Sequence, residues 1–149
     1  MRTTCLCFCV VFTLLVAGCR NGNPVSEFQS PSELPAGIWQ LEAFVRDARL
    51  RDVLGETELT LEFRVGEEIN MGGRAGCNFY GGAVSWENGR LVVGPIGQTQ
   101  MLCLKPKGVM EQEETYLSVL RSAVELRVGG DQLVLFDADR KPVLVFSRP

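Results

Sequence analysis

The chain contains no histidine among its 149 residues. Histidine is the base of the Ser-His-Asp triad and of the Cys-His dyad, and it is the commonest nitrogen ligand of zinc. Its absence excludes both catalytic arrangements and most zinc sites. We therefore expect no catalytic residue, no metal site and no cofactor.

The chain also has no excess of positive charge. It carries 15 Lys+Arg against 18 Asp+Glu, which gives a formal net charge of −3. Binding to a nucleic-acid backbone requires a basic face, so nucleic acid is excluded as a partner. The length indicates a single globular domain, which we expect to be a monomer.

No apolar run is long enough for a membrane-spanning helix, which needs roughly 20 residues. The run from Cys5 to Ala17 has thirteen residues and follows a single charge, Arg2. This pattern fits the apolar core of a secretory signal peptide. The run ends in Leu15-Val16-Ala17-Gly18-Cys19, which resembles a bacterial lipobox. The resemblance implies cleavage before Cys19 and acylation (palmitate) of Cys19, which would then hold the protein on a membrane.

These features predict three segments. Residues 1–18 form the lipoprotein signal peptide, residues 19–36 form a lipidated cysteine and a flexible Pro/Ser tether, and residues 37–149 form the folded domain. An uncleaved N-terminal anchor, or cleavage elsewhere, is the alternative. Arg20 stands where an Asp often signals inner-membrane retention, which favours the periplasmic side of the outer membrane in a Gram-negative host.

Two cysteines remain after removal of the signal peptide and acylation of Cys19, namely Cys77 and Cys103. They either form one disulfide or stay as two buried thiols. An exported protein usually enters an oxidising compartment, which favours the disulfide.

Apolar residues recur with period two from Gly37 onward, which predicts strands with one buried face. Asn88-Gly89 is a strong hairpin signal between two of these runs. The expected segments, about eight, are 39–45, 59–65, one beginning at 69–71, 79–86, 90–98, 124–128, 133–136 and 143–146. This spacing predicts a mainly β protein, with a small antiparallel barrel or sandwich.

Two segments interrupt this pattern. Val109–Ala123 has helical spacing, including Glu113 and Tyr116, and acidic residues near its start, where the helix dipole favours them. We expect this helix to cover an open end or side of the sheet rather than to bind a partner. Residues 46–56 mix both charges and indicate a solvated connection with one apolar turn. The alternative is a contact loop or a short membrane-surface helix.

The segment from Gly72 to Gly82 holds five glycines in eleven residues. A phosphate cradle would open a helix, but a strand pattern follows here. The segment therefore predicts a sharp corner or bulge between two strands, with the ring of Tyr80 buried and its hydroxyl bonded to a partner.

Two motifs in this region resemble those of the META/HslJ domain family. Gly76-Cys77-Asn78, Tyr80 and Gly82 match GCNxYxG, and Thr99, Met101 and Cys103 match TxMxC. The resemblance covers about 37–146 and implies a lipocalin-like β-barrel with one packed α-helix. It also supports the pairing of Cys77 with Cys103. Members of this family are often envelope proteins, some linked to heat shock, drug tolerance or virulence, and no agreed enzymatic activity comes with the family.

The motif residues have two interpretations. In the structural one, Gly76, Asn78 and Gly82 form the corner, Thr99 bonds the backbone and Met101 fills the core; in the other, they form a ligand site. We favour the structural interpretation.

The expected function is therefore that of a non-catalytic, lipid-anchored envelope domain with a binding or stress-related role. Its partner would be an envelope protein or a small ligand. The alternative is a hydrolase inhibitor or a lipoprotein that binds a small apolar ligand. Asp137 and Asp139 resemble a glycosidase pair in composition, but a position between two strands fits turn formers better.

Overall fold

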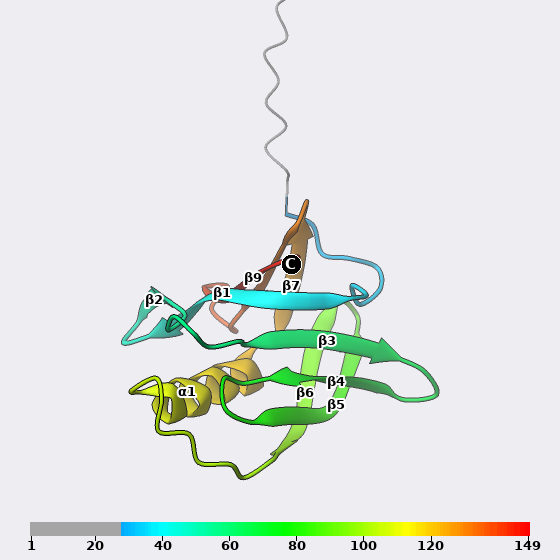
Figure 1. The fold of residues 1–149 in the computed structure, drawn as a ribbon. Helices are drawn as coiled ribbons and strands as arrows, with labels where there is room; N and C mark the ends of the chain where they lie inside the picture. The colour runs from blue at the N-terminus through cyan, green and yellow to red at the C-terminus, as the bar shows by residue number, and fades with distance from the viewer. Residues whose placement is uncertain (1–27) are drawn as a thin grey trace, which may run out of the picture.

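The protein, seen in a computed structural model that describes residues 28–149, is a curled antiparallel sheet with one helix packed against it (Figure 1). The predicted signal peptide and Cys19 lie outside the described residues. The elements are β1 (Ile38–Arg46), β2 (Arg49–Asp52), β3 (Thr60–Val65), β4 (Ile69–Arg74), β5 (Phe79–Glu87), β6 (Arg90–Gln98), α1 (Val109–Ser122), β7 (Glu125–Gly129), β8 (Gln132–Phe136) and β9 (Pro142–Ser147). Within the described part of the chain, no helix is long and apolar enough to cross a membrane.

The strands follow the order β6-β5-β4-β3-β1-β9-β8-β7, and β2 adds to β1 outside this path. The two ends of the sheet approach each other, and the backbone N–H of Leu91 donates to the carbonyl of Val124 at 3.0 Å. No strand ladder joins β6 to β7 in the described sheet, so it curls like a barrel but stays open. The mainly β prediction is confirmed, with nine strands in place of about eight.

The additional strand is β2, which corrects the expected solvated connection at residues 46–56. Asp47 and Ala48 have left-handed φ angles of 52° and 56°, which make a two-residue hairpin turn. Arg49 and the residues after it then pair with the end of β1. All four residues of β2 are exposed, so no buried period-two face marked it in the sequence.

The hairpin between β5 and β6 forms where the sequence predicts it. Asn88 and Gly89 have φ angles of 53° and 76°, and Glu87 pairs with Arg90 directly before and after them. A register shift between Gly82 and Val84 interrupts the β5–β6 ladder. Such bulges increase the twist of a strand and help the sheet to curl.

The core lies inside the curl and is filled by the inward residues of the strands together with one face of α1. From β1, Trp39 is fully buried, and α1 contributes Tyr116 and Leu120 to the same cluster. The other largest fully buried side chains are Leu59, Leu61, Met71, Leu91, Leu117, Leu126, Leu133, Leu135 and Phe146. The helix thus covers the sheet, as its apolar stripe predicts.

The segment before β1 also contacts the domain. Gln29 pairs with Val128 through two backbone hydrogen bonds of 3.0 and 2.9 Å. Leu34 is buried, and the indole N–H of Trp39 donates to the carbonyl of Pro35 at 3.5 Å. Residues 28–36, which the sequence assigns to a tether, therefore lie against the folded unit, which begins before Gly37.

Candidate functional site

The glycine-rich turn between β4 and β5 is an anion cradle that the chain fills itself. Gly76 has a φ of 109°, which suits glycine and lets the next two amides point the same way. The N–H groups of Cys77 and Asn78 both donate to Oε2 of Glu113, at 3.2 and 2.7 Å. Successive backbone N–H groups of this kind form a concave site for an anion. The turn therefore binds a carboxylate of α1 rather than a phosphate.

Glu113 is 1% exposed and has a neutral set of donors. Its Oε1 accepts hydrogen bonds from Nδ2 of Asn78 at 2.7 Å and from Nε2 of Gln98 at 3.4 Å. None of the ion pairs among the described residues includes it. The buried carboxyl group is thus satisfied by hydrogen bonds alone, which is the condition for tolerating a buried polar group.

This role of Glu113 was not predicted from the sequence. The acidic residues at the start of the helix were assigned to the helix dipole instead. The available signal was that Glu113 occupies a position of the helical stripe that also holds Tyr116, and this stripe faces the core.

Asn78 joins the turn to the segment that follows β6. Its Oδ1 accepts hydrogen bonds from Oγ1 of Thr99 at 2.8 Å and from the N–H of Met101 at 2.7 Å. Its Nδ2 donates to the carbonyl of Met101 at 3.1 Å. Thr99 Oγ1 also accepts the N–H of Phe79 at 3.2 Å. Asn78 of the first motif thereby binds both the N–H and the carbonyl of Met101 in the second. The sequence interpretation gave Thr99 a backbone bond, which it makes to Phe79, but it did not include the contacts of Asn78 with Met101.

The disulfide between Cys77 and Cys103 makes a second link between the two motifs. Its Cα atoms are 5.9 Å apart, and this is the pairing that the family resemblance implies. We call residues 99–108 the braced loop, because the disulfide and the bonds of Asn78 attach it to the β4–β5 turn at separate points.

The outer side of the braced loop is apolar. Leu102 is 78% exposed and Leu104 is 82% exposed, the two highest values among the large exposed hydrophobic residues of the described chain. Met101 is 47% exposed, which corrects the prediction that it fills the core. Asn78 holds the backbone of Met101 on both sides, and the side chain consequently faces outward. The motifs thus present a fixed backbone with exposed apolar side chains.

The hydroxyl groups of Tyr80 and Tyr116 meet inside the core at 2.7 Å. Their rings pack edge to face with centroids 5.7 Å apart, and the Tyr80 hydroxyl donates to the carbonyl of Thr60 at 2.8 Å. Burial raises the pKa of both phenols above the ordinary value of 10.0. This pair fastens α1 to β3 and β5 and leaves no hydroxyl open to a ligand.

This tyrosine pair predicts a cooperative alkaline transition. Tyr80 and Tyr116 are the two tyrosines of the chain. Their folded pKa values lie above the unfolded value, so the stabilisation is complete below about pH 10 and is lost as the pH rises further. Tyrosinate absorbance should therefore appear together with the loss of far-ultraviolet circular dichroism. Ionisation near pH 10 with unchanged circular dichroism would contradict the buried pair.

Gly82 of the first motif has a steric role that a substitution can test. An added Cβ would lie 2.6 Å from the carbonyl oxygen of Pro95, which is backbone and cannot rotate away. We expect Gly82→Ala to lower the free energy of unfolding by about 1–3 kcal/mol through overpacking. Gly55→Ala is the matched control, because its added Cβ would meet nothing within 4 Å. Equal urea midpoints for the two variants would remove this role of Gly82.

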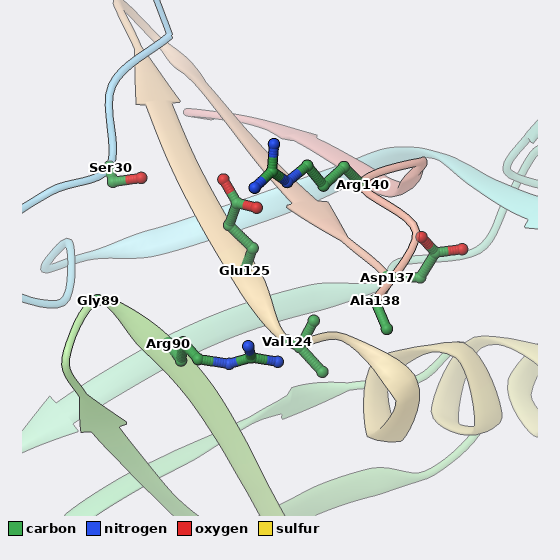
Figure 2. Close-up of a pocket in the computed structure, with 8 residues that line it drawn as sticks. All are labelled: Ser30, Gly89, Arg90, Val124, Glu125, Asp137, Ala138 and Arg140. Carbon is green, nitrogen blue, oxygen red and sulfur yellow. The ribbon is translucent and has the colours of Figure 1, made fainter.

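A polar cleft lies where the sheet fails to close, at the start of β7 (Figure 2). It has a volume of about 300 Å³, and the side chains of Arg90, Glu125 and Arg140 surround it. Glu125 is paired with Arg127 at 2.6 Å. The cleft is therefore lined by charges of both signs. It lacks the excess of one sign that would select an anion or a cation.

Asp137, at the edge of this cleft, takes part in a turn. Its Oδ1 accepts the N–H groups of Asp139 and Lys141, both at 2.9 Å. Asp139 is exposed and lies 3.6 Å from the ammonium of Lys141. These contacts are those of turn formers. Within residues 28–149, no group of three or more Cys, Asp or Glu side chains is arranged to hold a metal ion.

Comparisons with known proteins agree with this fold. The family model of the META domain matches residues 32–149. An NMR structure of a protein from Burkholderia xenovorans is 27% identical, with a TM-score of 0.62, and the alignment covers 75% of this chain and 81% of that one. A second NMR structure is 22% identical, with a TM-score of 0.52 and coverage of 74% and 87%, and shows the fold alone. No curated protein matches the chain.

Proposed function

Because the chain belongs to the META domain family, we propose that it is a non-catalytic, lipid-anchored domain of the bacterial cell envelope that binds through the braced loop. In this proposal the role is binding or protection under envelope stress. Membership of the family supports the fold, and the exposed apolar side chains of the braced loop support its role as the binding surface.

One observation carries the proposal: the polar groups of both motifs are bonded to one another, whereas the apolar side chains between them face solvent. Asn78, Thr99 and Glu113 bond each other or nearby backbone, and Cys77 is consumed by the disulfide. A site for chemistry needs polar groups directed at a substrate. An apolar surface on a fixed backbone suits association, because little conformational freedom is lost on binding.

The anchor is supported by the lipobox that ends at Cys19. Acylation of a processed N-terminal cysteine with more than one chain gives stable membrane attachment. Intact-mass measurement of protein extracted from membranes tests this step. We expect a chain that begins at Cys19 and carries acyl chains, and loss of membrane attachment in the Cys19→Ser variant. An unmodified chain that begins at Met1 would refute the anchor.

The binding role is tested by crosslinking in cells with the full acylated protein. A photoreactive residue replaces Leu102 in one variant and Val65 in the control, since both side chains are exposed and apolar. Adducts that form at position 102 and not at position 65 are the expected result. Equal adducts at both positions, or none, would contradict binding through the braced loop.

A second candidate function is binding of a small apolar ligand. A groove of about 460 Å³ lies beside the segment before β1 and is lined mainly by apolar surface, including Leu34, Ile69 and Trp86. Ligand pockets typically begin at about 300 Å³. An apolar fluorescent probe such as anilinonaphthalene sulfonate tests this groove. Binding that Ile69→Asp abolishes and Leu102→Asp leaves unchanged would favour this candidate over the braced loop.

A further inference from the structure

We propose that the braced loop inserts its apolar side chains into the surface of an anionic lipid bilayer. The inference rests on the proposed function only in taking this loop as the binding surface. It does not require the lipid anchor, because the contact is made by the folded domain.

The apolar part of this contact is a protrusion rather than a groove. Leu102 and Leu104 flank Cys103 in the chain, and both side chains are more than three-quarters exposed. Phe79, which is half exposed, lies beside the start of the loop, since it exchanges hydrogen bonds with Thr99. Side chains placed in this way can enter the boundary between headgroups and acyl chains, where their transfer from water is favourable.

The charge within the loop itself is positive, although the chain as a whole is negative. Residues 99–108 contain Lys105 and Lys107 and no acidic residue. Next to the loop, the guanidinium of Arg74 lies 4.7 Å from the centre of the Phe79 ring. Anionic headgroups attract Lys and Arg close to the bilayer by about 1 kcal/mol each, which is roughly five-fold in partitioning per residue.

Four acidic side chains occur near the loop: Glu113 is buried in the β4–β5 turn, and two of the three exposed ones have cationic partners. Glu58 pairs with Arg74 at 3.4 Å, and Glu111 pairs with Arg46 at 3.1 Å. Glu114 lies further along α1 and is exposed. Lys105 and Lys107, which directly follow the apolar tip in the chain, are both exposed.

The size of the surface favours a bilayer over a protein partner. A stable protein interface buries about 800 Å² on each partner. An interface of that size uses about 20–30 residues on each side, whereas three side chains, Met101, Leu102 and Leu104, form the apolar tip. A bilayer imposes no such minimum, because each inserted side chain adds its own transfer free energy.

The position of the loop is compatible with an anchor in the same bilayer. Figure 1 shows the segment between β6 and α1 at the end of the domain opposite to the place where the described part of the chain begins. The nine residues from Cys19 to Phe28 can span about 30 Å when extended. A nine-residue strand such as β6 has about the same length. If the line from the start of the described chain to the braced loop runs parallel to the membrane, the acylated end and the loop can both reach the same bilayer.

Quenching of fluorescence by brominated lipid tests the insertion. The full chain carrying Leu102→Trp, together with Cys19→Ser so that no acyl anchor holds it, is added to vesicles of brominated phosphatidylcholine with about 30% phosphatidylglycerol, an anionic lipid. We expect the emission contributed by the new indole to fall measurably, because insertion places this indole at the boundary of headgroups and acyl chains, next to the bromine atoms. The unsubstituted chain gives the background from Trp39 and Trp86.

Matched variants separate insertion from general adhesion. Val65→Trp places an indole at an exposed position of β3, and there we expect no added quenching. In the Leu102→Trp chain, Lys105→Glu with Lys107→Glu should lower partitioning by at least about ten-fold. The same reversal at Arg49 and Arg51, which are exposed on β2, should change it much less.

Three results would overturn the inference. These are equal quenching at positions 65 and 102, quenching that is the same on vesicles without phosphatidylglycerol, and protein adducts at position 102 in cells with no quenching by lipid. The last result would assign the braced loop to a protein partner and leave the proposed function intact. Failure of acylation, measured separately by mass, would remove the anchor without affecting this result.

Discussion

The Glu113→Ala variant is expected to lose about 3–5 kcal/mol of unfolding free energy, one of the two largest effects that the structure predicts. The substitution removes the acceptor of the N–H groups of Cys77 and Asn78. It also leaves one of the two side-chain N–H groups of Asn78 unpaired, while the other keeps the carbonyl of Met101. Each unsatisfied buried donor costs about 1–3 kcal/mol, and part of this cost is relieved if water enters. Urea unfolding, followed by circular dichroism, measures the effect.

Glu114→Ala is the matched control for this prediction, because Glu114 is the next residue of α1 and is exposed. Its effect should stay within about 0.5 kcal/mol. Glu113→Gln keeps the shape of the side chain but replaces one acceptor oxygen with a donor group. We therefore expect its loss of unfolding free energy to lie between the losses of Glu113→Ala and Glu114→Ala. Equal midpoints for Glu113→Ala and Glu114→Ala would show that the carboxylate does not hold the turn.

The Cys77→Ser variant is expected to lose about 3–4 kcal/mol, the second large effect. The disulfide closes a segment with a sequence separation of 26 residues, and a loop of this length restricts the unfolded chain by about that amount. The melting temperature of a domain of this size should fall by about 10–15 °C. Differential scanning calorimetry under non-reducing conditions measures the change.

Reduction of the unsubstituted protein is the control for the cysteine variant. It should lower the melting temperature by a similar amount, and a reductant should have no further effect on Cys77→Ser. Unchanged melting of Cys77→Ser without reductant would mean that the crosslink is not structural. The variant should still fold, because Asn78 continues to hold Met101 through its amide group.

The two links to the braced loop have different physical origins. The disulfide acts mainly on the unfolded chain, whereas the hydrogen bonds of Asn78 act in the folded state. Loss of one link should therefore leave the loop attached by the other. This redundancy is what we expect of a segment that must keep its apolar side chains exposed without collapsing onto the core.

Much of the fold could be predicted from the sequence, because local signals and tertiary structure agree there. Period two marked the inward residues in the first half of β1, such as Trp39, which is buried. It was wrong in the second half, where a register shift between Leu41 and Ala43 turns Phe44 inward. Asn88-Gly89 specified a hairpin by its tolerance of left-handed backbone. The helical stripe from Val109 identified α1 to within one residue of its observed end at Ser122. In each case a short segment contained the whole signal.

The sequence was less informative where a residue's role depends on contacts between distant segments. Glu113 and the turn at Gly76 are far apart in the chain, and no local pattern shows that the carboxylate fills the turn. Met101 is apolar, so composition placed it in the core, whereas the contacts of Asn78 direct it outward. The hairpin of β2 is exposed on both faces and thus has no period-two signal.

The central claim is that the two motifs hold the braced loop in one conformation, and amide hydrogen exchange at single residues tests it most directly. The N–H groups of Thr99 and Met101 are bonded to the carbonyl of Phe79 and to Oδ1 of Asn78. We predict that both N–H groups exchange slowly in the intact protein. In Asn78→Ala, the N–H of Met101 should lose its protection from exchange, while the N–H groups of the β5–β6 ladder should keep theirs. Fast exchange of Met101 in the intact protein would contradict the claim, because the loop would then be mobile and its apolar side chains would not be held in place.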